Sequence, residues 1–500
     1  LETFFGNLPD SPPIAFVVIQ HLDPARKSLM AELLGRRTSL KVIQADDGLA
    51  LEPGKVYTLP PDKDLLLHDG VLALAPREKT RVRHMVIDRF FRSLAEDMGP
   101  RAVGIVLTGA GSDGSQGIKE IKAAGGMVMV QDQAQAEYAS MPASAIATGQ
   151  ADFILPIEQI PRELLRYLEH PYMEPDKGEP EARPTSDEQI MRRILLKVRR
   201  VTGHDFSGYK RNTILRRIER RMALQRVESL GDYQNLLNQS PDEVQRLFLD
   251  LIILVTNFFR DSRAFEALKH KAIVPLLREM KDAELLRVWV PGCATGEEAY
   301  SVAMLFLEAM DELGLYTRLK IFGTDINPQA LKAAREGVYP GNISADVSEE
   351  RLARFFDKRG EGYVVKDTLR EIMVFAAHDL TRDPPFSKLN LVSCRNLLIY
   401  MDSALQKRII PIFHYCLAPG GYLFLGTSEG VGEFANLFVP VQKKWKIFRA
   451  RDSGRIMRKS KQRPPREPHL TPITHEHAAS RRESPRESPG WLLEEGPNER

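Results

Sequence analysis

The stretch RVWVPGCATGEEAYSVAMLF (287–306) identifies the fold class of the second half of the chain. An apolar run typical of a buried strand leads into a glycine-containing loop, and the loop leads into an apolar helix. This order is typical of an open α/β sheet that binds a nucleotide, because glycine lets the backbone approach a ligand and a helix N-terminus offers free N–H groups. The loop lacks the GxGxxG pattern, which weakens a dinucleotide interpretation.

Charge around this loop indicates which ligand it suits. Glu297 and Glu298 open the expected helix, and two carboxylates there disfavour a phosphate and favour a cationic ligand. Asp325 ends the next expected strand, LKIFGTD (319–325), where a carboxylate can accept hydrogen bonds from both hydroxyls of a ribose. S-adenosylmethionine combines an adenosine with a sulfonium and an ammonium and has no phosphate. Taken alone, the glycine loop is equally consistent with a plain tight turn.

Strand and helix patterns alternate in two separate blocks of the chain. In block 283–450, further strands are expected at KLNLVSC (388–394) and LAPGGYLFLG (417–426), with a small β insertion at about 340–370 that could dock a receptor. Block 1–169 contains the apolar runs IAFVVI, AVGIVL and MVMV, the last two joined by an expected helix, which predicts a parallel β-α-β unit. The predicted fold class is therefore α/β, with two doubly wound, mostly parallel sheet domains.

A small all-α domain is expected between these two blocks, over residues 187–282. SPDE (240–243) predicts a helix start, with Ser240 as N-cap, Pro241 in the first turn and Glu243 completing a capping box. Residues 170–186 are rich in proline and charge and predict a linker, and residues 451–500 predict a disordered tail.

Composition excludes several classes of protein. The 500 residues predict two to four domains, and 70 Lys plus Arg against 67 Asp plus Glu leave a net charge of +3, which argues against a chain that binds nucleic acid along its whole length. Three cysteines exclude a disulfide scaffold and predict a reducing, cytoplasmic location. No apolar run is long enough for membrane insertion, and neither the cysteines nor the HEH of the tail predicts a metal site.

Several motifs in the second half of the chain occur together in one order. They are VTNFFRD (255–261), PGCATGEE (291–298), GTDINPQALKAAREGVY (323–339), HDL (378–380), SCRNLLIYMD (393–402) and LAPGGYLFLGTSE (417–429). Together they closely resemble the chemotaxis receptor glutamate methyltransferase, CheR, over about 187–450. The resemblance implies a Rossmann-like domain that binds S-adenosylmethionine and methylates glutamates on chemotaxis-type receptors.

The resemblance also implies which residues form the site. Glu298 is expected at the methionine portion of the cofactor, Asp325 at the ribose and Asp379 beside the adenine. The full expected cofactor set is Thr256, Arg260, Gly292, Glu298, Asp325, Asp379, Leu380, Cys394 and Arg395. Arg260 and Tyr400 are the expected catalytic residues; the alternatives are a surface arginine and a half-buried core tyrosine. Leu254 stands where the family usually has Asn, so one polar contact to the cofactor is in doubt.

Methylation of a glutamate asks little acid–base chemistry of the protein. The side chain has a pKa of about 4.3 and is already an anion at neutral pH, so no general base is needed. Catalysis can come mainly from proximity and in-line alignment, which contribute up to about 7–11 kcal/mol in favourable systems. Arg260 is expected to hold a carboxylate of the substrate or of the cofactor.

The helical block carries a basic stretch. Residues 191–226 hold twelve Lys and Arg and only two acids, and Arg216, Arg217, Arg220 and Arg221 share one expected helix face. This face is consistent with a solvated surface, or with docking onto an acidic partner such as a glutamate-rich receptor helix. RNA binding is a weaker alternative, because aromatic residues are not interleaved with the arginines.

The first block contains a histidine and an aspartate that follow expected strands. His21 follows IAFVVIQ and Asp113 follows IVLTGAGS, which suggests the base and orienter of a hydrolase, although a lone histidine at a strand end is more often structural. The motifs VVIQHLDP, GLALEPGKVYTLPPD and LTGAGSDGSQGIKEIKAAGG resemble the chemotaxis receptor methylesterase, CheB, over about 1–165. The resemblance implies that His21 is the general base and Asp113 its partner, and that TGAGSDG helps to form the oxyanion site, with Ala110 where the family usually has Met.

The nucleophilic serine of that family lies on the loop after its first strand, which we expect upstream of Leu1. AGSDG (110–114) and GTSEG (426–430) look like nucleophile elbows, but the first begins with Ala and the second lies in the methyltransferase-like block. We therefore expect these 500 residues not to hydrolyse esters by the family mechanism.

The predicted function is a fused sensory-adaptation enzyme in which one module methylates receptor glutamates and the other is built to reverse the reaction. Expected partners are methyl-accepting receptors with acidic helices, and histidine kinase or response regulator partners are an option; nucleic acid and membrane insertion are not expected. The chain would be cytoplasmic and recruited to receptor arrays. A methyltransferase acting on a different substrate and a non-catalytic scaffold are the alternatives.

Overall fold

The computed structural model describes residues 1–21, 28–76, 85–170, 172, 185–280 and 285–452. Most of the expected linker and all but the first two residues of the expected tail lie outside these ranges. No described helix is both long and apolar enough to cross a bilayer.

The first block contains the predicted parallel β-α-β unit. Strands β7 (Val103–Val106) and β8 (Met127–Gln131) pair in parallel, and α4 (Gly117–Ala123) connects them. β9 (Phe153–Leu155) extends this sheet, and every residue of β8 is buried, as a strand covered on both faces requires. A second parallel sheet has the order β1-β4-β2 and an antiparallel one the order β3-β6-β5. Their bounds are β1 Phe16–Val18, β2 Lys41–Gln44, β3 Leu49–Ala50, β4 Lys55–Thr58, β5 Lys63–His68 and β6 Val71–Pro76. The helices are α1 Glu2–Gly6, α2 Met30–Gly35, α3 Val86–Met98, α5 Ser140–Ala147 and α6 Ile160–Leu168.

The second block is helical, as predicted. Its helices are α7 (Thr185–Thr202), α8 (Arg211–Gln225), α9 (Leu230–Gln239) and α10 (Pro241–Leu251), around a core that includes Ile218, Tyr233 and Leu247. Ser240 caps α10 by accepting a hydrogen bond from the Glu243 N–H at 3.2 Å, with Pro241 in the first turn. The capping-box half of that prediction is wrong. The Glu243 carboxylate turns inward to the buried cation of Arg221, and the Ser240 N–H that it would have capped donates instead to the Leu236 carbonyl at 2.9 Å.

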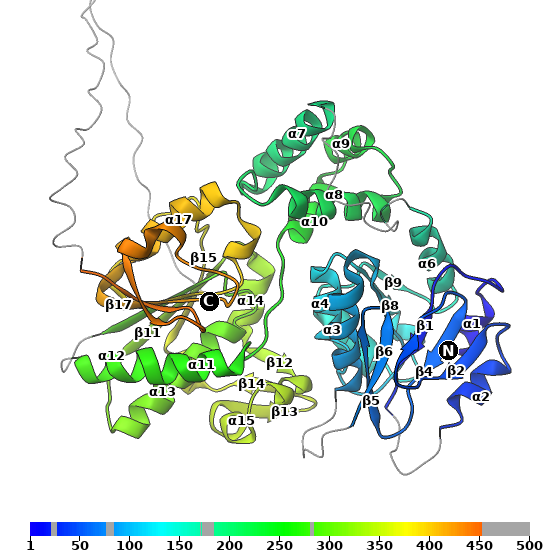
Figure 1. Ribbon diagram of the computed structural model, residues 1–500, viewed down its shortest axis with the longest axis horizontal. Helices are drawn as coiled ribbons and strands as arrows, with labels where there is room; N and C mark the ends of the chain where they lie inside the picture. The colour runs from blue at the N-terminus through cyan, green and yellow to red at the C-terminus, as the bar shows by residue number, and fades with distance from the viewer. Residues whose placement is uncertain (22–27, 77–84, 171, 173–184, 281–284, 453–500) are drawn as a thin grey trace, which may run out of the picture. The chain divides into compact units, whose positions relative to one another are not determined.

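A seven-stranded sheet organises the third block, in the order β15-β11-β10-β16-β17-β19-β18. The first five strands are parallel, and β19 and β18 add antiparallel pairs at one edge. Figure 1 shows α11, α12 and α13 along one face and α17 along the other, which matches two separate apolar cores. The strands are β10 Leu286–Pro291, β11 Leu319–Asp325, β15 Met373–Ala377, β16 Leu389–Cys394, β17 Leu417–Leu425, β18 Phe438–Gln442 and β19 Ile447–Ala450. The helices are α11 Ser262–Leu268, α12 Val274–Glu279, α13 Glu297–Leu313, α14 Pro328–Glu336, α15 Glu349–Phe355, α16 Asp367–Arg370 and α17 Ser403–Cys416.

Helices α11 and α12 were expected in the helical block, which was predicted to extend to residue 282, but they pack with the third block. Phe265, Leu268 and Ile273 are at most 1% exposed and pack in the core of the seven-stranded sheet rather than in that of the helical block. Helical periodicity shows that a segment has an apolar face but not which core covers it. A separate antiparallel sheet, β12 (Val338–Pro340), β14 (Gly362–Val365) and β13 (Phe356–Arg359), lies in the region where the sequence predicts an insertion.

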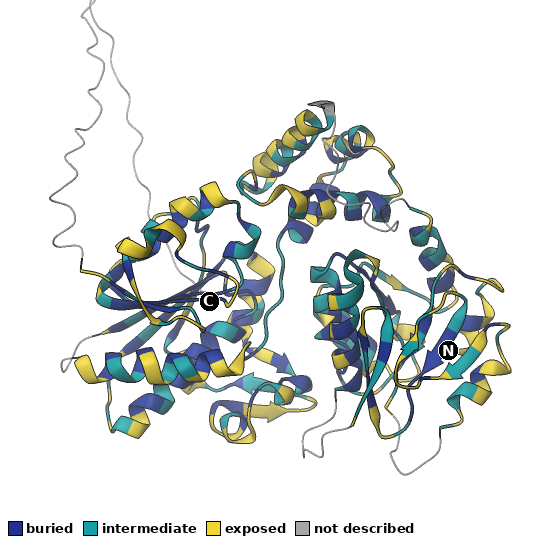
Figure 2. Ribbon diagram, in the orientation of Figure 1, coloured by how far each residue is buried: buried dark blue, intermediate teal, exposed yellow. Residues whose placement is uncertain are grey.

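Burial follows these layers. In Figure 2 the central strands of the seven-stranded sheet are buried, while α11 and α17 expose their outer faces. Trp289 and Val290, near the end of β10, are almost fully buried, and Gly292 directly after them is exposed. The carboxyl edge of the parallel strands is thus the place where the buried sheet meets open space, as in other open α/β sheets.

Candidate active site

One pocket lies at the carboxyl ends of β10, β11 and β16 and is closed on another side by residues of the helical block. The third block contributes the loops after these strands, and the helical block contributes residues 204–206, Tyr209 and the chain that follows α10. The structure brings together nearly all of the residues predicted for cofactor and substrate: Thr256, Arg260, Gly292, Glu298, Asp325, Asp379, Leu380, Arg395 and Tyr400.

Cys394 is the predicted residue that does not line this pocket. Its side chain is fully buried in the apolar core beneath, and burial raises the pKa of the thiol well above its usual value. Successive residues of a strand point to opposite faces, so the thiol of Cys394 lies in the core while Arg395 reaches the pocket.

Glu298 lies on the first turn of α13 and faces the pocket. Its Oε1 accepts a hydrogen bond from Ser393 Oγ at 2.6 Å. Burial raises the pKa of Glu298 above its ordinary value, and the positive charge of Arg395 opposes this rise. A carboxylate in this position is stabilised by a cationic ligand, which replaces the lost solvent.

Arg395 has spare hydrogen-bonding capacity. Its Nη2 donates to Asp261 at 2.6 Å, and its guanidinium lies over the rings of Phe265 and Phe424. The residue is 6% exposed, and its Nε and Nη1 have no hydrogen-bond partner within the described part of the chain. Buried donors are normally satisfied, so these two N–H groups, on a side chain that lines the pocket, are suited to a ligand with an oxygen anion.

Asp325 is placed by the end of β11 and fixed by the backbone. Oδ2 accepts the Ala294 N–H at 2.9 Å, which ties it to the glycine loop, and Oδ1 accepts the Asn327 N–H at 2.9 Å. Burial raises the pKa of this carboxyl despite these hydrogen bonds. A carboxylate oxygen can accept more than one hydrogen bond, so Asp325 retains capacity for the hydroxyls of a diol.

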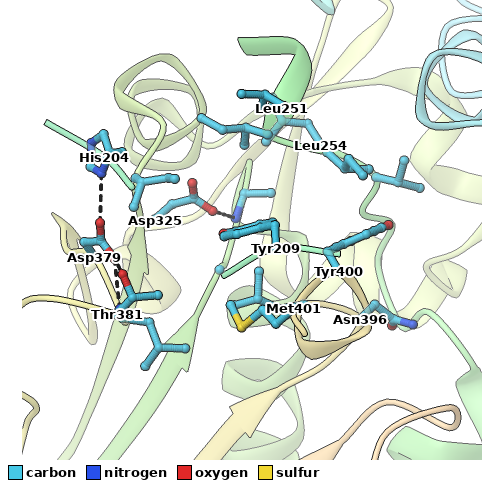
Figure 3. Close-up of a pocket in the computed structure, with 18 of the residues that line it drawn as sticks. His204, Tyr209, Leu251, Leu254, Asp325, Asp379, Thr381, Asn396, Tyr400 and Met401 are labelled. Atoms are coloured by element: carbon cyan, nitrogen blue, oxygen red, sulfur yellow. Dashed lines mark hydrogen bonds and ion pairs between the residues drawn. The ribbon is translucent and has the colours of Figure 1, made fainter. Parts of the chain in front are cut away.

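Asp379 is held in a polar cluster that the sequence did not predict in full. Its Oδ1 accepts from Thr381, and its Oδ2 lies 3.0 Å from Nδ1 of His204, a residue of the helical block (Figure 3). Burial alone would raise the pKa of Asp379, but the hydrogen bonds from Thr381 and His204 outweigh it, and the pKa lies below its usual value. His204 was missed because only the fold brings it to a residue 175 positions away.

Arg260 and Tyr400 lie at another side of the pocket. Arg260 Nη1 donates to the Val255 carbonyl at 2.9 Å, and the carbonyl of Tyr400 accepts from the Lys210 N–H at 2.8 Å. Both residues line the pocket, and both are half-buried. Their catalytic roles stay predictions. Leu254, the departure from the family pattern, lines it as well (Figure 3).

The 395–401 loop that carries Tyr400 is anchored by Glu429. This carboxylate accepts the N–H groups of Gly426, Asn396, Leu398 and Ile399 at 2.7–3.3 Å. Glu429 belongs to the GTSEG segment (426–430), which has the sequence pattern of a nucleophile elbow but lies in the methyltransferase-like block. Its own role was missed, although a carboxylate in a glycine-rich turn is a signal for backbone capping.

Three of the four arginines on the predicted basic face of α8 are not free at the surface, so for these three neither a solvated face nor a docking face is correct. Arg216 is exposed. Arg217, Arg220 and Arg221 are buried, with exposures of 5%, 0% and 6%. Arg220 pairs with Asp250 and with Asp152, and Arg221 forms a bidentate pair with Glu243. Arg217 donates to the carbonyls of Lys122 and Ala123. Polar periodicity alone cannot distinguish a solvated arginine from one neutralised by acids distant in sequence.

His21 and Asp113 form the pair that the sequence predicts in the first block. His21 Nε2 lies 3.0 Å from Asp113 Oδ2, with the histidine half exposed and the aspartate buried. Asp113 is oriented by the backbone N–H groups of Ile87, Asp88 and Gly114. No serine, threonine or cysteine of the described residues is hydrogen-bonded to His21.

Within the ranges that the structure describes, one group of side chains has metal-ligand chemistry. Ligand atoms of His68, Asp69 and Asp97 lie within 4.8 Å of one another. The Asp97 carboxylate already accepts the N–H groups of Asp69 and Gly70, so it orders a surface turn between two strands. The closeness of these three side chains is therefore explained by the turn that Asp97 stabilises, without a metal ion.

Comparison with known families agrees with this arrangement. The model of the CheR methyltransferase SAM binding domain matches residues 254–447, that of the CheR all-alpha domain matches 189–252, and that of the CheB methylesterase matches 1–164. The S-adenosylmethionine cofactor predicted from the acidic loop is thus confirmed by the family of the third block.

Three known proteins illustrate the similarity. An uncharacterized 104.1 kDa protein of Rhodobacter capsulatus is 38% identical over 447 residues, which cover 85% of this chain and 46% of that protein, so this chain spans less than half of that relative. Chemotaxis protein methyltransferase 1 of Pseudomonas aeruginosa is 32% identical over 243 residues, 47% of this chain and 87% of that protein. The CheB methylesterase catalytic domain of Thermotoga maritima is 33% identical, covering 33% of this chain and 89% of that one, with a TM-score of 0.31. The chain belongs to the chemotaxis protein methyltransferase family, and it carries a CheB methylesterase domain ahead of its CheR domains.

Proposed function

We propose that this chain methylates glutamate side chains of methyl-accepting chemotaxis-type receptors with S-adenosylmethionine, and that its first block serves the reverse hydrolysis. The observation that carries the methyl transfer is the pocket in which Glu298, from the first turn of α13, meets Asp325, Asp379 and Arg395, from the ends of β11, β15 and β16. Three carboxylates and one guanidinium match a ligand that carries two cations, a ribose and one carboxylate.

The pocket residues fit the parts of this cofactor separately. Asp325 is suited to the ribose hydroxyls, and Asp379 with the adjacent Leu380 to the adenine. Glu298 is suited to the ammonium or sulfonium, and the unpartnered N–H groups of Arg395 to the carboxylate. When bound, the cofactor supplies an activated methyl group on a sulfonium.

The residues at the mouth of the pocket would position the substrate. A substrate glutamate is an anion at neutral pH and needs alignment rather than deprotonation. Arg260, whose guanidinium is fixed at one nitrogen by the Val255 carbonyl, retains other N–H groups to orient that carboxylate. Tyr400, whose pKa burial raises, stays a neutral hydroxyl beside the transferred methyl and does not add charge there.

Methyl transfer can be measured directly. Receptor-containing membranes are incubated with the protein and cofactor labelled in the methyl group, and base-labile methanol is then counted. We expect label in receptor glutamates with the wild type and none with Asp325→Asn, while the exposed Asp367→Asn behaves as the wild type. Cofactor binding without any base-labile label would contradict a receptor glutamate as the substrate.

The first block supports ester hydrolysis through the His21–Asp113 pair. The buried carboxylate orients the ring and can stabilise the imidazolium that forms when histidine takes a proton from a nucleophile. Methanol release from receptors methylated beforehand, with wild type and His21→Ala compared, tests this block. Methanol release by the wild type that is lost in His21→Ala would support the pair, and would contradict the expectation that these 500 residues do not hydrolyse the ester.

Receptor arrays would be the working location, with the chain in the cytoplasm and kinase or response regulator proteins nearby. The acidic methylation helices of such receptors provide the substrate glutamates. Co-sedimentation with receptor membranes, compared with membranes that lack receptors, measures this recruitment; equal sedimentation with both would argue against it.

A further inference from the structure

Glu429 occupies an unusual position for a carboxylate in this site. It is 6% exposed, and among the described residues it pairs with no lysine, arginine or histidine. Its four hydrogen-bond donors are all backbone N–H groups, at 2.7, 2.8, 3.0 and 3.3 Å. Burial raises its pKa, and these N–H groups oppose the rise. Because all the hydrogen bonds to this buried carboxylate come from backbone N–H groups, its role is to be sought in the backbone segment that it holds.

Three of these N–H groups belong to the loop that lines the pocket. Oε2 accepts from Asn396, and Oε1 accepts from Leu398 and Ile399. The loop enters a single 3-10 turn, Leu398–Tyr400, whose first N–H groups have no partner within the turn, and the carboxylate supplies one. Asn396 has a φ of +57°, in the left-handed region that asparagine adopts more readily than most residues with a side chain.

The surrounding residues are arranged around this contact. A Cβ added at Gly426 would lie 2.7 Å from Glu429 Oε2 and 2.9 Å from the Asn396 nitrogen, so only glycine permits the approach. The far end of the loop is tied by Gln406 Nε2, which donates to the carbonyls of Leu398 and Met401 at 2.8 and 3.0 Å. The loop is therefore held at both ends, and Tyr400 lies between them.

The loop touches the cofactor side of the pocket as well. A Cβ added at Gly292 would lie 2.9 Å from Leu397 Cδ2, so the 395–401 loop packs directly against the glycine loop. Glu429 also adds a fourth carboxylate near the pocket, beside Glu298, Asp325 and Asp379. Its charge acts on Glu298, the residue suited to the cationic part of the cofactor.

We propose that Glu429 is a positioning residue for methyl transfer: its ionised carboxylate holds the 396–400 backbone that presents Tyr400, and its charge favours the cationic cofactor over the neutral product. This rests on the proposed function only for the identity of the cofactor. S-adenosylmethionine and S-adenosylhomocysteine differ by a methyl group and a positive charge at sulfur. The buried anion that holds the loop therefore also makes the pocket bind S-adenosylmethionine more tightly relative to S-adenosylhomocysteine.

Glu429→Gln in the full chain tests this inference, because the amide has nearly the same shape but no charge and one fewer acceptor. The matched control is Glu433→Gln, four residues away, which removes an exposed ion pair with Lys407. Amide exchange of Asn396, Leu398 and Ile399 without ligand should become about tenfold faster or more in Glu429→Gln, because hydrogen bonds to a charged acceptor are lost. The control should match the wild type.

Calorimetry with S-adenosylmethionine and S-adenosylhomocysteine distinguishes a specific role of Glu429 from a general loosening of the fold. Glu429→Gln should weaken S-adenosylmethionine more than S-adenosylhomocysteine, changing the ratio of their Kd values by at least about threefold. Simple loosening of the fold would weaken both equally. Gly426→Ala provides a second variant, since its Cβ displaces the carboxylate without removing charge: exchange should rise while the Kd ratio changes less.

An unchanged exchange rate together with an unchanged Kd ratio in Glu429→Gln would overturn the inference. Should Glu429→Gln fail to fold, as judged by amide exchange of β10 at the centre of the seven-stranded sheet, Gly426→Ala tests by the same measurement whether the carboxylate holds the loop. Neither measurement uses a receptor. Cofactor binding with no receptor methylation would thus reject the proposed substrate and leave the role of Glu429 standing.

Discussion

Replacing Arg220 by methionine tests whether the α8 arginines hold the fold or face a partner. The side chain is fully buried, with Nε donating to the Gly126 carbonyl at 3.0 Å and the two Nη atoms paired with Asp250 and Asp152. Methionine has a similar length and no charge. Among the described residues, Arg220→Met leaves Lys122 as the ion-pair partner of the two buried carboxylates, 2.5 Å from Asp152 and 3.1 Å from Asp250.

The expected loss of stability follows from this geometry. Breaking a buried ion pair by removing one partner costs about 3–5 kcal/mol. Because Lys122 remains between the two carboxylates, we expect the lower end, about 3 kcal/mol. With a urea m-value of roughly 2 kcal/mol/M, the denaturation midpoint should fall by about 1.5 M. The exposed Arg216→Met on the same helix should change stability by less than about 0.5 kcal/mol.

The pH dependence of this loss has a definite sign. Burial alone would raise the pKa of Asp152 and Asp250, but Arg220 and Lys122 outweigh it and hold both below their usual value. A carboxyl with a lowered folded-state pKa contributes stability that is present above its unfolded pKa, about 3.9, and lost below it. The difference between wild type and Arg220→Met should therefore shrink as the pH falls through this range.

The opposite pattern would refute the reasoning. If Arg220→Met left the urea midpoint unchanged but raised the KM for receptor methylation, the arginine would face a partner, as the helix pattern first suggested. Urea unfolding at several pH values, together with receptor methylation kinetics, distinguishes the two cases.

Three further predictions concern the cofactor pocket. Burial raises the pKa of Glu298 and Asp325 in the free protein, so cofactor affinity measured by calorimetry should fall as the pH is lowered and these carboxylates take up protons; an affinity independent of pH would contradict their role. Gly292→Ala should weaken cofactor binding about tenfold or more, because the residue has a φ of +68° and the new Cβ would lie 2.9 Å from Leu397. Leu254→Asn restores the polar residue usual in the family and should tighten binding by up to about tenfold, as one added hydrogen bond allows; weaker binding would show that the apolar side chain is required.

Residues at the carboxyl ends of the parallel strands could be predicted as neighbours from the sequence alone. Asp325, Glu298 and Arg395 could be predicted as neighbours, because each follows or faces a recognisable strand and the carboxyl ends of parallel strands share one edge. His21 and Asp113 were paired by the same rule and lie 3.0 Å apart. Local chemistry and a topological rule suffice where both partners belong to regular elements.

Other contacts were decided by the tertiary structure alone. His204 meets Asp379 across 175 residues, and Arg220 finds acids from two separate blocks, so no local pattern marks either one. Glu429 and Glu243 look like surface carboxylates in the sequence, yet each is buried by a long-range partner. The physical reason is that periodicity records which faces avoid water, whereas a buried charge is stabilised only by the particular partners that folding brings to it.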